Sequence, residues 1–138
     1  MDSFAIFKVS ASALEAQKGR MNTLASNLAN INSTQTEAGG PYRRKDVVFS
    51  TVTIESKGPV PLQGVQVEKV TESQEPFKQV YDPNHPDADK DGMVSLPNVN
   101  LMEEMVNMMM ASRAYEANVT TFNLSKSMFL KALELGRV

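Results

Sequence analysis

Residues 87–92 carry the most recognisable chemistry in the sequence, in the run DADKDG. Asp87, Asp89 and Asp91 stand at alternate positions, and Gly92 follows them. In calcium-binding loops, carboxylates at the first, third and fifth positions ligate the ion, and a glycine at the sixth allows a sharp turn. The spacing is therefore typical of oxygen ligands for a hard cation.

The rest of the segment departs from the calcium-loop pattern. The twelfth position, a bidentate Glu in such loops, is Asn98, and Pro97 and Pro86 exclude the flanking helices of an EF-hand. We interpret residues 82–100 as a surface loop rich in Asx turns, without a metal site. The alternative hypothesis is a calcium-responsive helical adaptor that uses the loop at residues 87–92 and the methionine-rich helix after it.

Few other residues could serve in catalysis, because the chain has no Cys and a single His. His85 lies between Asn84 and Pro86 with no nucleophile suggested nearby, so we expect a solvated loop histidine. Glu103 and Glu104 are adjacent, and on a helix they point to different sides. No P-loop, G-x-S-x-G or dinucleotide-binding motif occurs. We expect neither an enzyme nor a cofactor.

Charge and hydropathy exclude several classes of partner. The formal net charge of −2 provides no electrostatic reason to bind nucleic acid or an anionic membrane. No apolar run approaches the roughly 18 residues that span a bilayer. Residues 1–9 lack the basic start and the apolar core of a secretory signal peptide. We therefore expect no nucleic-acid partner, no direct membrane insertion and no cleaved signal peptide.

A long helix is predicted over residues 100–135. Apolar residues recur there every seven positions, which places them on one face that is usually buried against another helix. Asn100 is a suitable N-cap with Glu103 completing a capping box, and Gly136 stands where a left-handed residue would end the helix. About 36 residues form a rod of roughly 54 Å, which suggests contacts with other chains. The predicted packing residues are Leu101, Met105, Met108, Tyr115, Val119, Phe122, Phe129 and Leu133.

A second helix is predicted within the first 35 residues from a shorter seven-residue repeat. Ser10 and Gln17 make its apolar stripe partly polar, and Gly19 costs roughly 1 kcal/mol relative to Ala, so this helix needs a partner. Asn residues crowd its last third. They favour either a frayed, solvated helix end or amide hydrogen bonds between subunits. The predicted packing residues are Phe7, Leu14, Met21, Leu24, Leu28 and Ile31.

The middle of the chain predicts a small antiparallel β unit. Residues 46–55 are rich in β-branched and aromatic types, and apolar and polar residues alternate over residues 65–69. A third strand is expected at residues 77–81. The predicted fold is mainly α with a β insert: helices in segments 1–35 and 97–138, paired as an antiparallel coiled coil, flank the β unit and loops of residues 36–96.

A short basic run, YRRK, precedes the first predicted strand at residues 42–45. Such a run is usually solvated. The alternative is that Arg43 and Arg44 contact an acidic neighbouring surface.

Two terminal motifs and three internal stretches carry a resemblance to a known family. Residues 25–32 read ASNLANIN and residues 113–118 read RAYEAN, while GGPYRR, YDPNHPDAD and PNVN occur at residues 39–44, 81–89 and 97–100. The terminal motifs are similar to those of flagellar axial proteins, and the internal stretches to one rod protein among them. The chain is thus identified as a member of the flagellar basal-body rod protein family. The matching motif residues are Asn27, Leu28, Ala29, Asn30, Arg113, Tyr115, Glu116 and Asn118.

The resemblance implies a structural subunit. Such a subunit would polymerise through its terminal helices into the proximal rod, a tube that transmits torque and conducts exported subunits. It would leave the cell interior through the flagellar type III apparatus and lie where the rod crosses the periplasm. The implied partners are other copies of the chain, other rod proteins, and proteins at the junction of the MS ring and the export gate.

Overall fold

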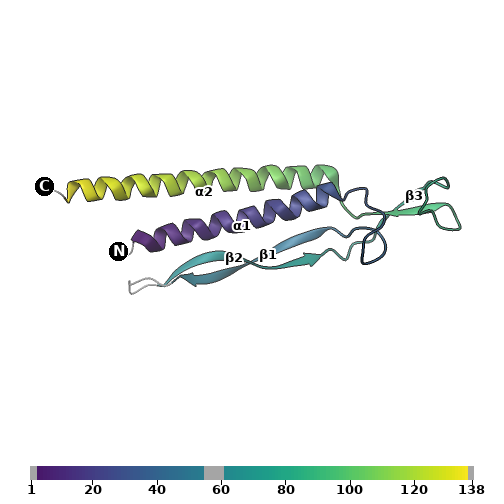
Figure 1. The fold of residues 1–138 in the computed structure, drawn as a ribbon, viewed down its shortest axis with the longest axis horizontal. Helices are drawn as coiled ribbons and strands as arrows, with labels where there is room; N and C mark the ends of the chain where they lie inside the picture. Colours follow the sequence, from purple (N-terminus) through teal and green to yellow (C-terminus); the bar gives the residue numbers. More distant parts are fainter. Residues whose placement is uncertain (1–2, 55–60, 137–138) are drawn as a thin grey trace.

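A computed structural model describes residues 3–54 and 61–136, and arranges them along one long axis (Figure 1). Helix α2 forms one layer, α1 lies in the middle, and the β1–β2 ribbon covers the other side of α1, while β3 and β4 project beyond the helices. The described part of the chain is therefore mainly helical with a β insert, as predicted. The elements are α1 (Ser3–Ala29), β1 (Lys45–Ile54), β2 (Leu62–Glu72), β3 (Lys78–Tyr81), β4 (Met93–Leu96) and α2 (Leu101–Leu135).

The start of α2 follows the sequence prediction, whereas its end does not. Asn100 is extended, with φ −105°, and its side chain accepts a hydrogen bond from the Met102 N–H at 3.1 Å. The carboxylate of Glu103, predicted to complete a capping box, lies 3.6 Å from the Arg44 guanidinium instead. Gly136 has φ −82°, so the predicted left-handed ending is wrong. Its N–H still donates to the carbonyl four residues earlier, so the last turn stays helical.

The two helices lie side by side and run in opposite directions (Figure 1). Near the chain termini, the rings of Phe7 and Phe122 pack edge to face, with their centroids 5.2 Å apart. At the other end of the pair, Asn27 donates to Glu104 at 2.9 Å. The helix predicted to be weak alone thus has a partner within the same chain.

Strands β1 and β2 pair antiparallel along their whole length, with a bulge between Val48 and Phe49. Both strands contact α1, and the Val65 N–H donates to the Ser12 hydroxyl at 3.2 Å. This hairpin confirms the first two predicted strands. Because α1 is covered by α2 on one side and by the hairpin on another, it is the most enclosed element of the fold.

The third strand was predicted to belong to the same β unit, and the structure corrects this. β3 pairs with β4 in a separate two-stranded sheet, with Lys78 opposite Leu96 and Tyr81 opposite Met93. The sequence prediction placed β4 inside a loop. Its four residues are flanked by Asp, Asn and Pro, and only their pairing with β3 shows that they form a strand. The predicted last residue of the first strand, Glu55, lies outside the described residues.

Replacing Gly64 with Ala is expected to lower the free energy of unfolding by about 1–3 kcal/mol. A Cβ at this position would lie 2.6 Å from Ser12 Oγ and 2.8 Å from Ile54 Cδ1, and Ser12 is held there by its bond to Val65. Denaturant unfolding of the purified chain measures the loss. Adding Ser12→Ala removes the closest obstacle, so the double variant should lose less than the sum of the single variants. Strict additivity would contradict this explanation.

Candidate functional site

Eight of the less exposed residues of α2 form a series at alternating intervals of four and three positions, the spacing of a helix–helix seam. Phe7 packs against Phe122 and Phe129, with ring centroids 5.2 and 6.2 Å apart. Aromatic side chains of α2 alternate there with small or polar ones, which leaves room for the rings of α1. The seam residues of α2 are Glu104, Met108, Ala111, Tyr115, Asn118, Phe122, Ser125 and Phe129.

The predicted packing residues divide into two groups in the structure. Leu24 is 4% exposed, and ten others are half-buried: Phe7, Leu14, Met21, Leu28, Ile31, Met108, Tyr115, Val119, Phe122 and Phe129. Leu101, Met105 and Leu133 are exposed by 49%, 52% and 51%, and Leu133 lies one turn beyond Phe129, which packs against Phe4 near the start of α1. A packing role for these three stays a prediction.

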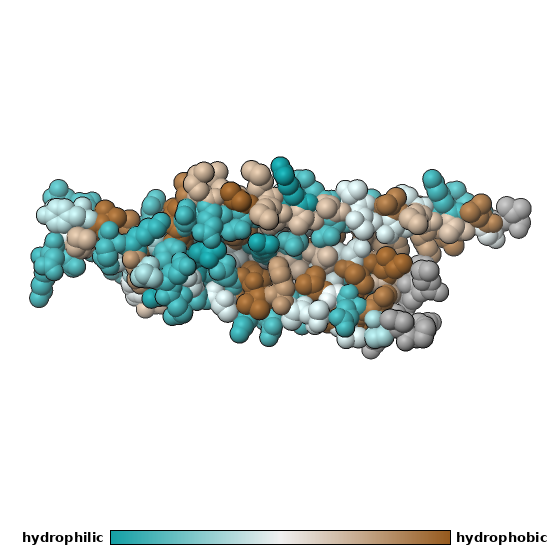
Figure 2. All heavy atoms as spheres, turned by 180° about the vertical axis from the view of Figure 1, so that it is seen from behind, coloured by the Kyte–Doolittle hydropathy of each residue, from teal (hydrophilic) through white to brown (hydrophobic). Residues whose placement is uncertain are grey.

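The side of α2 away from the seam is rich in exposed apolar residues (Figure 2). Monomeric proteins rarely expose large contiguous apolar patches without an interaction that covers them. We call this surface the outer face. Its residues are Leu101, Met102, Met105, Val106, Met109, Met110, Leu124, Met128, Leu130 and Leu135.

A buried polar junction joins the end of α1 to the starts of β1 and α2. Asn27 is 0% exposed, and all four hydrogen-bonding positions of its amide are used. Its Oδ1 accepts from the Tyr42 hydroxyl and the Lys45 N–H, each at 2.9 Å. Its Nδ2 donates to the Lys45 carbonyl at 2.8 Å and to Glu104 Oε2 at 2.9 Å. One side chain thus fixes three segments relative to one another.

Glu104 supplies the buried charge of this junction. It is 0% exposed, and its Oε1 accepts from Arg44 Nε. Arg44 also contacts Asp46 at 2.8 Å, and Glu103 lies 3.6 Å away. Burial opposes the charge of Arg44, but the hydrogen bond to Glu104 and the three nearby carboxylates outweigh it, so the pKa of Arg44 is raised above its ordinary value. The guanidinium therefore stays charged, and the buried carboxylate keeps a cationic partner.

The junction extends to the segment before α2. The backbone N–H of Arg44 donates to Asn98 Oδ1 at 2.8 Å, and Asn98 Nδ2 donates to the Glu75 carbonyl at 3.0 Å. Asn98 is 7% exposed. One amide therefore ties together the residue before β1, the segment after β2 and the segment before α2.

These contacts correct two sequence interpretations. Asn27 was expected to be solvated at a frayed helix end or to bond to another subunit, and both expectations are wrong. It is buried, and its hydrogen-bond partners belong to the same chain. Arg44 is not solvated, and its acidic contacts also come from its own chain. Arg43 donates to the Ser73 carbonyl at 3.1 Å and lies 4.3 Å from the centroid of the Phe77 ring.

Sequence reasoning missed Glu104, Tyr42 and Asn98 as a group. A glutamate in the first turn of a helix is ordinarily explained by the helix dipole, and Glu103 beside it is exposed. The sequence did contain two opposite charges, Arg44 and Glu104, near the start of a predicted strand and of a predicted helix. Nothing in their spacing indicated that they meet.

The other motif residues occupy varied positions. Asn30 donates to the Ser26 carbonyl at 2.9 Å and accepts from the Ser33 hydroxyl at 3.0 Å, which closes the turn after α1. Tyr115 and Asn118 are half-buried in the seam, and Leu28 is half-buried on α1. Ala29, Arg113 and Glu116 are exposed.

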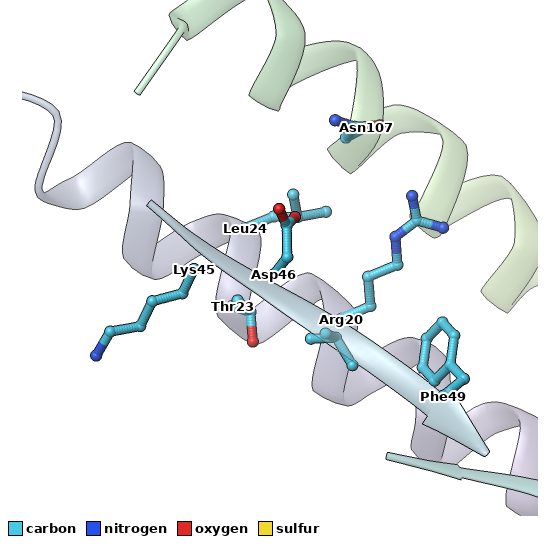
Figure 3. A pocket seen from close by; sticks show the side chains of 8 residues that line it. Arg20, Thr23, Leu24, Lys45, Asp46, Phe49 and Asn107 are labelled. Atoms are coloured by element: carbon cyan, nitrogen blue, oxygen red, sulfur yellow. The ribbon is translucent and has the colours of Figure 1, made fainter. Parts of the chain in front are cut away.

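A cavity of about 280 Å³ lies between α1, β1 and α2. Figure 3 shows Arg20 extending from α1 between β1 and α2, with Phe49 of β1 beside it. The lining side chains include no nucleophile placed beside a general base. The cavity is a groove between these three elements, and its lining residues are Arg20, Thr23, Leu24, Lys45, Asp46, Val47, Phe49 and Asn107.

The loop at residues 87–92 forms the predicted Asx turns. Asp89 Oδ1 accepts from the N–H groups of Asp91 and Met93, each at 2.9 Å. Asp87 Oδ2 accepts from the Thr34 hydroxyl at 2.7 Å. Within the described residues, no group of three or more His, Asp or Glu side chains is placed to hold a metal ion. The calcium-adaptor alternative therefore has no support from the geometry.

Calcium titration of the purified chain is expected to show no saturation below about 1 mM. Asp89 already accepts two backbone hydrogen bonds, and ligation of calcium would disrupt this turn. Isothermal titration calorimetry measures the binding. A micromolar isotherm in the wild-type chain that disappears in Asp89→Ala would contradict this expectation.

Neither α1 nor α2 contains a stretch long and apolar enough to cross a bilayer.

Comparisons with known proteins agree with the terminal motifs. Residues 7–35 match the family described as "Flagella basal body rod protein", and residues 90–135 match "Flagellar basal body rod FlgEFG protein C-terminal". The chain is 48% identical over 132 residues to the flagellar basal-body rod protein FlgC of Salmonella typhimurium, covering 96% of each chain. It is 44% identical to FlgC of Borreliella burgdorferi, with 98% of each chain covered. It is 42% identical to FlgC of Bacillus subtilis, with 99% of this chain and 100% of the relative covered.

Proposed function

Because this chain belongs to the flagellar basal-body rod protein family, and its full-length relatives are FlgC proteins, we propose that it is a structural subunit of the flagellar rod. The proposed mechanism rests on one observation: the outer face of α2 is apolar and exposed. Met102 and Leu124 are 69% and 61% exposed, while the opposite side of the same helix already packs against α1. A helix that is apolar on both sides needs a partner beyond its own chain.

The two terminal helices form the assembling part in this proposal. Residues 1–35 and 97–138 pair as an antiparallel coiled coil, and residues 36–96 form an insert between them. The alternating spacing of the α2 seam and the stacked Phe7, Phe122 and Phe129 rings support the pairing. The polar junction around Asn27 and Glu104 holds the two helices at one register, because a shift along the axis would leave both groups buried without partners.

The outer face then packs against other copies of the chain and against other rod proteins. Leu101, Met105 and Leu133, which α1 leaves about half exposed, belong to these contacts. The methionine side chains favour such a role because flexible thioethers adapt to neighbours that are not identical. The polymer forms a tube that transmits torque and conducts exported subunits.

The subunit is exported by the flagellar type III apparatus without a cleaved signal peptide, and it lies in the proximal rod across the periplasm. The β insert and its loops face outward or bridge to adjacent rod proteins, including those at the junction of the MS ring and the export gate. The insert includes the β3–β4 hairpin, which projects beyond the helices (Figure 1).

Deletion and complementation in the source bacterium test the proposal. Cells without the chain are expected to be non-motile, and electron microscopy of isolated basal bodies should show no complete rod. Expression of the wild-type chain should restore both. Complete rods in the deletion strain would refute the proposed function.

A further inference from the structure

The chain concentrates oxidisable sulfur on one surface. It contains nine Met but no Cys and no Trp, so thioethers are its only sulfur side chains. Met102, Met105, Met109 and Met110 on the outer face are exposed by 69%, 52%, 57% and 59%. We call these four residues the methionine face.

The helical spacing groups these side chains. Positions 102, 105 and 109 lie on one side of an α-helix, and position 110 is adjacent to them. Val106 lies one turn from Met102, Met109 and Met110, Leu101 lies one turn from Met105, and both are also exposed, by 53% and 49%. The result is an apolar patch on the first three turns of α2, visible as hydrophobic spheres in Figure 2. Four of the six exposed apolar side chains in this patch are thioethers, so close packing of another apolar surface against it requires that they stay unoxidised.

We propose that the methionine face is an oxidation site for peroxides in the unassembled chain, and that its sulfoxide form cannot join the polymer. The first part rests on this chain's own exposure pattern, because oxidation of Met follows accessibility. The second part rests on the proposed function, since it requires the outer face to pack against another copy.

The reaction is an oxygen transfer that balances with peroxide as the only oxidant. A thioether lone pair attacks one peroxide oxygen, the O–O bond breaks, and an S–O bond forms. Hydrogen peroxide leaves as water after a proton shift, and an alkyl peroxide leaves as an alcohol. Sulfur is oxidised by two electrons and peroxide is reduced by two. Methionine sulfoxide reductases reverse the change, taking the two electrons from thiols, which become a disulfide.

Oxidation to the sulfoxide makes the methionine face costly to bury against another apolar surface. It converts a flexible apolar side chain into a polar one with a strong hydrogen-bond acceptor. Leu101, Val106 and Met109 are the exposed apolar neighbours of Met102 and Met105 on the helix, and none of these three side chains carries a hydrogen-bond donor. Burial of the oxidised face against a second apolar surface would leave these acceptors unpaired. Once assembled, the same packing would shield the thioethers from peroxide.

Peptide mapping by mass spectrometry tests the first part on the purified chain. Dilute hydrogen peroxide is expected to oxidise the methionine face at least about fivefold faster than the half-buried Met21, Met93 and Met108. Met128, which is 64% exposed elsewhere on α2, provides the reference rate for an exposed Met. Equal rates at exposed and half-buried positions would overturn the proposal.

Sedimentation equilibrium tests the second part. The association constant of the chain is expected to fall at least tenfold after oxidation and to recover after treatment with the reductases. A variant with Leu at all four positions and at Met128 should lose less than about twofold of its own untreated association constant on peroxide treatment, whereas Met21→Leu should lose as much as the wild-type chain. Unchanged association of the oxidised wild-type chain would overturn this second part and leave the proposed self-assembly intact. Failure of the untreated chain to associate would count against both this second part and the proposed self-assembly, while the mapping still decides the first part.

Discussion

Replacing Glu104 with Ala is expected to lower the free energy of unfolding by about 3–5 kcal/mol. The carboxylate is fully buried and accepts hydrogen bonds from Arg44 and Asn27, which both lose a partner when it is removed. Arg44 keeps its contact with Asp46 at 2.8 Å, which places the expected loss near the lower end of that range. Denaturant unfolding of the purified chain, followed by circular dichroism, measures the difference.

Glu103→Ala is the matched control. Its side chain is 56% exposed and lies 3.6 Å from the same guanidinium, so its removal should change the free energy of unfolding by no more than about 1 kcal/mol. Glu104→Gln keeps the size and the carbonyl acceptor but removes the charge, and it should fall between the two Ala variants. Equal losses of unfolding free energy for Glu103→Ala and Glu104→Ala would contradict the prediction that the buried carboxylate contributes more to stability than the exposed one.

The repeating apolar pattern was sufficient to predict both helices and their mutual packing. Phe7 and Phe122 are 115 positions apart in sequence, yet each belongs to a seven-residue series, and such series pack against each other. The first two strands were also predictable, because alternating and β-branched residues follow the local geometry of a strand. These elements depend on local periodicity, which the sequence displays directly.

The missed features depend on contacts between distant residues. Glu104 is buried because Asn27, 77 positions away, and Arg44, 60 positions away, meet it in the folded chain. Strand β4 is short and becomes a strand through its pairing with β3. Neither contact has a periodic signal, so the sequence predicted no partner for Glu104 and placed β4 within a loop.

The role of Gly19 also depends on a contact with a distant residue, although the sequence analysis singled this glycine out. Its cost within a helix was interpreted only as weakness. In the structure, a Cβ at this position would lie 3.0 Å from Val67 Cγ2, so the glycine permits close packing of α1 on β2. The reason for the glycine lies on another element, which the sequence of the helix does not reveal.

Phe122→Asp is expected to abolish both helix pairing and motility. The ring packs edge to face on Phe7 at 5.2 Å, and a carboxylate placed in this seam would lose the aromatic contacts and face apolar surface. The expected loss in the free energy of unfolding is roughly 3 kcal/mol, the low end for removal of a core Phe because this ring is half-buried. Circular dichroism of the purified chain and swimming of the complemented deletion strain measure the two effects.

Leu124→Asp separates the seam from the outer face. Leu124 lies two residues from Phe122 but is 61% exposed, so a carboxylate there should leave the unfolding free energy within about 0.5 kcal/mol of wild type. It should nevertheless prevent motility, because the outer face would then carry an unpaired charge into a contact with another subunit. Asn123→Asp, on an exposed polar position, controls for the added charge on the isolated chain. Motile cells carrying Phe122→Asp would refute the intrachain seam, whereas motile cells carrying Leu124→Asp would refute only the assignment of the outer face to assembly.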